Sequence, residues 1–174
     1  MILPRAICLL LLAAPSPGRA AEAVAPVPDG AVVLDIGTPA VKKANLRRGW
    51  SIPEGIPGRL VNWTNRMEAD IEVALPAPAD REVEVTAVPF FIMGRRQRAG
   101  LFVNNRFAGD WVYGEEPGFE THRVRVPAAL WKEGVNVLTL RVAYIGRNKG
   151  LERRKLGLKV DTVSILPAAP AEGR

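Results

Sequence analysis

The chain has 174 residues, of which 48% are hydrophobic and 24% charged, as in an ordinary globular domain. It contains one Cys and one His, which excludes a disulfide framework, a Cys-ligated zinc site and a CxxC redox site. The formal net charge is +6, and the excess of Lys and Arg lies mainly in the second half. Such a bias is compatible with a solvated surface, or with acidic glycans or anionic lipid head groups as partners. No helix-turn-helix or RNP-like pattern points to nucleic acid.

Residues 1–20, MILPRAICLLLLAAPSPGRA, have the layout of a secretory signal peptide. Arg5 supplies the positive start, an apolar run extends from Ala6 to Ala14, and small residues follow. Cleavage is expected after residue 20, or as late as residue 23. The mature chain then contains no Cys, which suits an oxidising compartment. We therefore expect an exported protein, periplasmic or extracellular, with no transmembrane segment after cleavage.

The next part of the sequence is built from short segments in which apolar and polar residues alternate, the pattern of half-buried strands. In chain order the expected strands are 31–36, 67–75, 82–90, 99–103, 107–112, 122–126, 135–144 and 156–165. The Asn104–Asn105 pair predicts a tight turn that tolerates positive φ. Residues 127–134, PAALWKEG, predict one short helical turn, with Pro near its start and Gly at its end.

Short strands at about ten-residue spacing favour an all-β sandwich over βαβ units. We expect one antiparallel β-sandwich of the jelly-roll type over residues 31–166. The Ala- and Pro-rich segments 21–30 and 167–174 are expected to be flexible ends.

Two groups of motifs resemble known families. The stretch LFVNNRFAGDW (101–111), followed by HRVRVPAALWKEGVNVLTLRV (122–142), resembles galactose-binding-like jelly-roll domains. GWSIPE (49–54), WTN (63–65) and RRKLGLKVDTVSI (153–165) together resemble the β-sandwich modules attached to bacterial enzymes of surface-polysaccharide synthesis. The resemblance covers about residues 32–166, and it departs from the family pattern at Asn65–Arg66 and at Asn105. It implies a non-catalytic, carbohydrate-binding-like module, accessory to the synthesis or export of cell-surface polysaccharide.

The candidate binding residues are aromatic and charged side chains near expected loops. A flat indole stacks on the apolar face of a sugar ring, while a neighbouring carboxylate or guanidinium bonds to its hydroxyl rim. A pair of arginine side chains can also bind the carboxylate or phosphate groups of a ligand. The expected carbohydrate contacts are Trp50, Glu54, Trp63, Trp111, Arg95 and Arg96. The alternative is that the Trp side chains pack in the core, as we expect for Trp131, and that the arginines belong to a solvated loop.

Metal and cofactor sites have little support in the sequence, and we predict neither. Asp35, Glu54 and Asp161 are the carboxylates that could contribute to a structural calcium site, but no Asp-rich loop accompanies them. His122 alternates with apolar residues and is expected to be a half-buried strand residue.

The sequence also lacks GxSxG and HExxH motifs, so we expect no enzyme activity. A glycosidase pair formed by Glu54 with Glu115 or Glu116 is the remaining hydrolase hypothesis. A different hypothesis is a periplasmic protein-interaction subunit that docks on an envelope enzyme through its basic half and exposed Trp side chains.

Overall fold

The structure is a computed structural model and describes residues 29–116, 118–147 and 154–169. The expected signal peptide and most of the two expected flexible ends lie outside these residues. Within the described ranges, no helix has the length and the apolar character that crossing a membrane requires.

Strands account for most of the described chain. They are β1 (Val32–Asp35), β2 (Glu54–Ile56), β3 (Arg59–Trp63), β4 (Glu68–Leu75), β5 (Arg81–Pro89), β6 (Arg98–Val103), β7 (Arg106–Val112), β8 (Glu120–Val126), β9 (Gly134–Val142), β10 (Gly146–Arg147), β11 (Lys155–Leu156) and β12 (Leu158–Pro167). The helix α1 spans Pro39–Ala44, and the 3-10 turn η1 spans Ala128–Leu130.

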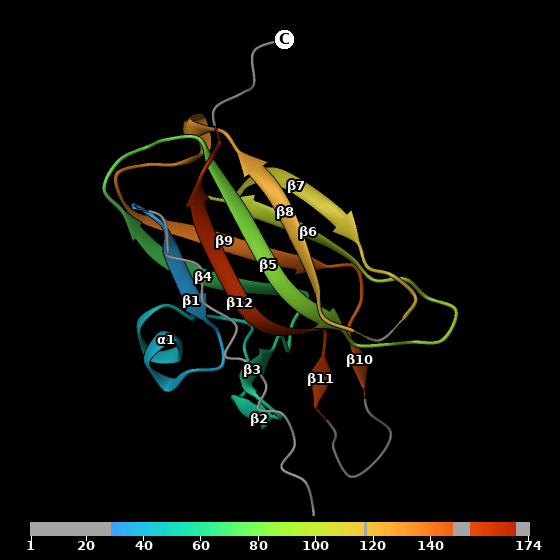
Figure 1. Ribbon diagram of the computed structural model, residues 1–174. Helices are drawn as coiled ribbons and strands as arrows, with labels where there is room; N and C mark the ends of the chain where they lie inside the picture. Colours follow the sequence, from blue (N-terminus) through green and yellow to red (C-terminus); the bar gives the residue numbers. More distant parts are fainter. Residues whose placement is uncertain (1–28, 117, 148–153, 170–174) are drawn as a thin grey trace, which may run out of the picture.

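Two antiparallel sheets lie face to face and form a β-sandwich (Figure 1). The larger sheet has the order β2-β3-β12-β5-β8, with β1 also paired to β12. The smaller sheet has the order β4-β9-β6-β7, and β10 and β11 form a separate two-stranded ribbon. The antiparallel β-sandwich predicted from the sequence is confirmed.

Alternation of side chains explains why these strands make one core. In β5 the even spacing places Val83, Val85 and Ala87 on the buried face, and in β4 it does the same for Ile71 and Val73. Residues from both sheets join in one buried hydrophobic cluster. The polar residues between them face solvent, so each sheet presents one outer face to water.

The predicted turns have the expected backbone. Asn104 and Asn105 adopt φ values of 49° and 65°, as a two-residue hairpin requires. The expected helical turn is a single 3-10 turn, shorter than its sequence signal. Trp131 follows it and is buried, as predicted.

The helix α1, the β2–β3 hairpin and the β10–β11 ribbon were not predicted from the sequence. In α1, the Thr38 side chain accepts a hydrogen bond from the Val41 backbone N–H, and Pro39 opens the helix. Residues 54–63, for which the sequence predicts no strand, form the β2–β3 hairpin, which turns at Gly58 with φ of 79°. This hairpin places Glu54 beside the end of β3.

Candidate functional site

Glu54 occupies the centre of a charged cluster at the β2–β3 end of the sandwich. Its Oε1 accepts a hydrogen bond from the Trp63 indole N–H at 2.9 Å and lies 3.2 Å from Lys159 Nζ. Its Oε2 accepts a hydrogen bond from Arg154 at 3.0 Å. One carboxylate therefore connects β2, β3, β12 and the residue that precedes β11.

These contacts keep Glu54 ionised. Partial burial by itself raises the pKa of the carboxyl group, but the hydrogen bonds from Arg154, Lys159 and Trp63 outweigh it, so the pKa lies below its ordinary value. The general acid of a glycosidase needs the opposite, a carboxyl group with a raised pKa. The environment of Glu54 is that of an ion-paired anchor.

Trp50 and Trp63 lie in the protein interior. Trp50 is 9% exposed, belongs to the core cluster and donates its indole N–H to the Asp70 backbone oxygen at 2.8 Å. Trp63 is 8% exposed, with Lys159 Nζ 4.9 Å from its ring centroid and Phe90 against its edge. Both rings therefore take the packing role that the sequence left open, and little of either surface is available to a sugar.

Trp111 belongs to an aromatic cluster at the β7–β8 side of the sandwich. Its ring stacks on His122 with centroids 5.5 Å apart, and Tyr113 meets His122 edge-on at 4.7 Å. Burial raises the pKa of the Tyr113 hydroxyl, so this cluster is uncharged around the phenol. His122 is half-buried, as predicted, and lies 3.1 Å from a Glu120 oxygen.

Arg95 and Arg96 belong to the β5–β6 loop, and Figure 1 shows this loop away from β2, the strand that begins at Glu54. Both are exposed, and they border a hollow of about 390 Å³ that Phe91, Met93 and Glu115 also line. Arg96 Nε donates a hydrogen bond to the Tyr113 backbone oxygen at 3.2 Å, which holds the Arg96 side chain in place. The six predicted residues therefore do not form one site: Glu54 and Trp63 touch, whereas the arginines and Trp111 lie elsewhere.

A cavity of about 620 Å³ opens beside the Glu54 cluster; we call it the loop-end cavity. Its lining is polar and basic, with two apolar side chains. The lining residues are Ser51, Asn65, Arg66, Met67, Ile145, Arg154 and Lys155. None of these described lining residues is Asp or Glu, so this part of the wall favours an anionic group.

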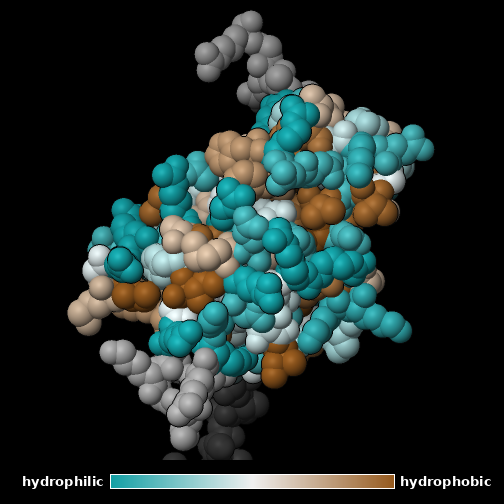
Figure 2. Space-filling view, turned by 180° about the vertical axis from the view of Figure 1, so that it is seen from behind, coloured by the Kyte–Doolittle hydropathy of each residue, from teal (hydrophilic) through white to brown (hydrophobic). Residues whose placement is uncertain are grey.

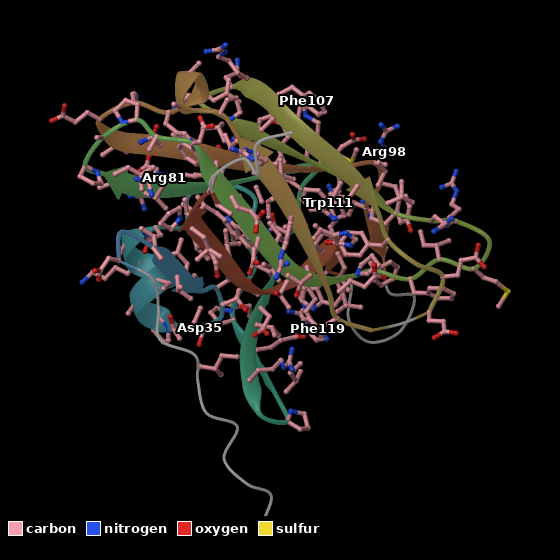
Figure 3. All side chains as sticks on the ribbon, turned by 45° about the horizontal axis from the view of Figure 1, so that its top comes forward. Asp35, Arg81, Arg98, Phe107, Trp111 and Phe119 are labelled. Carbon is pink, nitrogen blue, oxygen red and sulfur yellow. The ribbon has the colours of Figure 1, made fainter. Side chains whose placement is uncertain are left out.

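A second hollow lies on the outer face of the four-stranded sheet; we call it the sheet-face groove. It measures about 270 Å³, and its lining residues are Arg98, Ala99, Gly100, Phe102, Phe107, Asp110, Arg141, Val142 and Ala143. In Figure 1 this sheet lies behind the larger one, so Figure 2 views its side, where hydrophobic patches interrupt a mainly hydrophilic surface. Figure 3 shows Phe107 and Arg98 toward the outside, with Trp111 nearer the middle.

Aromatic rings and ion pairs meet in this groove. Phe107 is 58% exposed and contacts Phe102 edge to face, with centroids 5.5 Å apart. The Arg141 guanidinium lies 4.1 Å from the Phe102 centroid, so it stacks on that ring. Between the rings and the charges, Gly100 contributes no side chain, which leaves the middle of the groove open.

Each charged group in the groove has a partner of opposite charge. Arg98 pairs with Asp110, and Arg141 pairs with Glu68 at 2.7 Å. Glu68 also pairs with Arg48 at 2.9 Å. The pairs fix planar hydrogen-bonding groups around an exposed ring while leaving the groove nearly neutral. This arrangement suits an uncharged polar ligand with one apolar face.

Two of the carboxylates named for a calcium site, Glu54 and Asp161, form ion pairs with arginine side chains. Asp161 pairs with Arg59 at 3.0 Å, and the Arg59 guanidinium lies 4.6 Å from the Phe119 centroid. Burial raises the pKa of Asp161 by more than the Arg59 charge lowers it. In the part of the chain that the structure describes, no group of three or more His, Cys, Asp or Glu side chains is arranged to hold a metal ion.

Phe102, Phe107 and Arg141 are not among the binding residues predicted from the sequence. A signal was present, because Ala99, Leu101 and Val103 fill one face of the expected strand and leave Phe102 on the other. The tight Asn-Asn turn then places Phe107 opposite Phe102 across the hairpin. A Phe pair on a strand is a weaker sequence signal for sugar stacking than a Trp, since Phe is also a common core residue.

Comparisons with known proteins agree on the fold. The chain aligns with the GH26-CBM35 β-(1,4)-mannanase of Podospora anserina at 13% identity and a TM-score of 0.52, covering 82% of this chain but only 29% of the mannanase. It aligns with a family 35 carbohydrate-binding module from Clostridium thermocellum at 14% identity and a TM-score of 0.52, covering 78% of this chain and 98% of that module. No protein-family model matches the sequence, and no curated protein matches it significantly. The chain has the galactose-binding-like β-sandwich fold of family 35 carbohydrate-binding modules.

Proposed function

We propose that the chain is an exported, non-catalytic carbohydrate-binding module whose sheet-face groove holds a sugar ring. The observation that carries the proposal is Phe107, an exposed aromatic side chain on a sheet face, surrounded by the ion-paired Arg98, Asp110 and Arg141. The fold shared with family 35 carbohydrate-binding modules supports the same ligand class.

The chemistry of the groove matches both surfaces of a pyranose. The C–H face of the ring packs on Phe107, and the hydroxyl groups at its rim bond to the guanidinium and carboxylate groups nearby. Because the groove is shallow, the binding free energy should be on the order of −4 to −7 kcal/mol, roughly millimolar to ten micromolar.

The residues predicted from the sequence take supporting parts in this proposal. Trp50, Trp63 and Trp111 hold the scaffold, and Glu54 fixes Arg154 at the wall of the loop-end cavity. Arg95 and Arg96 are proposed as an outlying contact for acidic groups of the same polymer, because both are exposed at a loop.

The proposed setting is the cell envelope. The likeness of GWSIPE and RRKLGLKVDTVSI to modules of surface-polysaccharide enzymes supports an accessory role in polysaccharide synthesis or export. The signal-peptide pattern supports a periplasmic or extracellular location.

A second candidate function is docking on an envelope enzyme. The β5–β6 loop favours it, because Met93 is 88% exposed and Phe91 50% exposed beside Arg95 and Arg96. Apolar and Arg side chains together are common at protein interfaces. A variant with Met93→Ser should then lose its protein partner while retaining every glycan interaction.

Two substitutions test the sugar site: one fills the groove, and the other removes its stacking ring. A Cβ at Gly100 would lie 3.6–3.8 Å from its nearest neighbours, which is ordinary contact, so Gly100→Val should fold and occupy the groove. Phe107→Ala removes the stacking ring. The matched control is Leu60→Ala, which shortens an exposed apolar side chain on β3, outside the groove and the other hollows described above.

The measurement is calorimetric titration with a panel of neutral and acidic bacterial oligosaccharides. Gly100→Val and Phe107→Ala should each weaken binding at least tenfold, and Leu60→Ala should leave it unchanged. Unchanged affinity in both groove variants, with unfolding transitions like that of the wild type, would refute the site.

A further inference from the structure

The sheet-face groove and the loop-end cavity share a rim. Val142 lines the groove, and its backbone N–H donates to the Met67 oxygen at 2.9 Å, while Met67 lines the cavity. After β9 the chain passes from Ala143 in the groove to Ile145 in the cavity. Two residues of extended chain span at most about 7 Å. One extended ligand can therefore lie over both hollows.

The two hollows differ in charge. In the groove the cations Arg98 and Arg141 are neutralised by Asp110 and Glu68. In the cavity, Arg66 and Lys155 have no ion-pair partner among the residues that the structure describes, and none of the described lining residues is Asp or Glu. The groove thus favours an uncharged ring, and the cavity favours an anionic group.

The boundary between the hollows is itself neutral. Glu68 follows Met67 in sequence and is the acidic group nearest the shared rim along β4. It is paired with Arg48 at 2.9 Å and with Arg141 at 2.7 Å. An anionic ligand that enters the cavity therefore meets Arg66 and Lys155 without an unpaired carboxylate at this edge.

We propose that the groove and the cavity form one binding track for an acidic heteroglycan. An uncharged pyranose lies on Phe107, and the adjoining part of the same chain places a carboxylate, sulfate or phosphate between Arg66 and Lys155. Ser51 and Asn65 line the same cavity and supply hydrogen-bonding groups to the charged residue. This inference rests on the proposed function and names the class of polymer that the groove binds.

The first arm of the test varies the ligand. The probes are a neutral oligosaccharide, a length-matched oligosaccharide of alternating neutral and uronic acid residues, and the carboxyl-reduced form of the latter. Sulfated and phosphorylated analogues distinguish the sources of negative charge. The alternating ligand should bind with one molecule per chain, about tenfold tighter than its carboxyl-reduced form, and this gain should fall as salt concentration rises.

The second arm varies the protein. Lys155→Gln and Arg66→Gln should each weaken the alternating ligand three- to tenfold and leave the neutral ligand unchanged. Gly100→Val should weaken both ligands. The matched control is Lys43→Gln, which removes an exposed Lys from α1 on another part of the molecule. In the Gly100→Val, Lys155→Gln double variant the two losses should multiply for the alternating ligand, because one chain contacts both places.

The outcomes separate the track from the proposed function. If the groove variant weakens both ligands but the cavity variants weaken neither, the track is wrong and the groove remains a sugar site. If two ligand molecules bind per chain, and the neutral one does not compete with the acidic one, the hollows are independent and the track is again wrong. If Gly100→Val and Phe107→Ala bind every ligand like the wild type, the proposed sugar site itself fails.

Discussion

Replacing Glu54 with Gln tests whether the charged cluster stabilises the fold at the β2–β3 end. The substitution keeps an oxygen that can accept from the Trp63 indole, and it removes the charge that Arg154 and Lys159 face. The shape of the side chain is nearly unchanged, so the measured difference reports mainly the charge.

The expected loss follows from the exposure of the cluster. The side chains of Glu54, Arg154 and Lys159 are 27%, 28% and 21% exposed, so their ion pairs lie between a surface pair and a buried one. Surface pairs contribute about 0.2–1 kcal/mol each, and hydrogen bonds to charged groups about 1.5–3 kcal/mol. We expect Glu54→Gln to lower the free energy of unfolding by about 1–2 kcal/mol at pH 7. For a chain of this size the melting temperature should fall by about 2–8 °C.

The loss should depend on pH in one direction. Because the folded-state pKa of Glu54 lies below its ordinary value of 4.5, the stabilisation is complete above that pH. It disappears as the pH falls through the folded-state pKa, where the wild-type carboxyl group also becomes neutral. The wild type and Glu54→Gln should therefore converge in thermal melts toward pH 3. The control is Glu82→Gln, which weakens an exposed pair with Arg123 at 3.7 Å and should cost less than about 0.5 kcal/mol. A difference for Glu54→Gln that stays constant from pH 7 to pH 3 would contradict the ion-pair assignment.

Two further substitutions test the packing around this end. Gly49→Ala should destabilise the protein by more than about 3 kcal/mol, because Gly49 has φ of 86° and an added Cβ would lie 2.0 Å from the Glu68 oxygen. Gly55→Ala should fold normally, because its Cβ would lie 3.8 Å from the Leu60 side chain, which is ordinary contact. Equal chemical denaturation midpoints for the two variants would disprove this. Asn62→Val should raise the free energy of unfolding by about 1 kcal/mol. Asn62 is fully buried, and neither atom of its side-chain amide has a hydrogen-bond partner in the described part of the chain. A lower melting temperature for the variant would show that the amide is stabilising.

The strands were predictable because their physical signal is local. In β4 and β5, apolar side chains recur at every second position, and the burial of Ile71, Val73, Val83 and Val85 follows the same period. The helix α1 escaped prediction because six residues are too few to show a helical period. The capping residue Thr38 and the helix-opening Pro39 are present in the sequence, but these two residues alone do not predict a helix.

The candidate site was harder to predict, since exposure is a property of the assembled sandwich. Trp50 and Trp63 stand in a Pro- and Gly-rich stretch that has no alternation, so the sequence does not say which face of each ring is covered. The cover comes from distant residues, such as Lys159 over Trp63. The groove likewise needs β6, β7 and β9 side by side, and the pairing of β6 with β9 joins residues far apart in the chain.

The position of β12 has a consequence for how the molecule is made. This strand pairs with β1 and β3 on one side and with β5 on the other, so it holds the larger sheet together although it follows all the other described strands in the sequence. Until β12 has been synthesised, β3 and β5 lack the neighbour that satisfies their backbone groups, and their edges remain open to pairing with other chains. Folding must therefore wait for long-range pairing late in synthesis, and during that interval the nascent polypeptide depends on protection from aggregation.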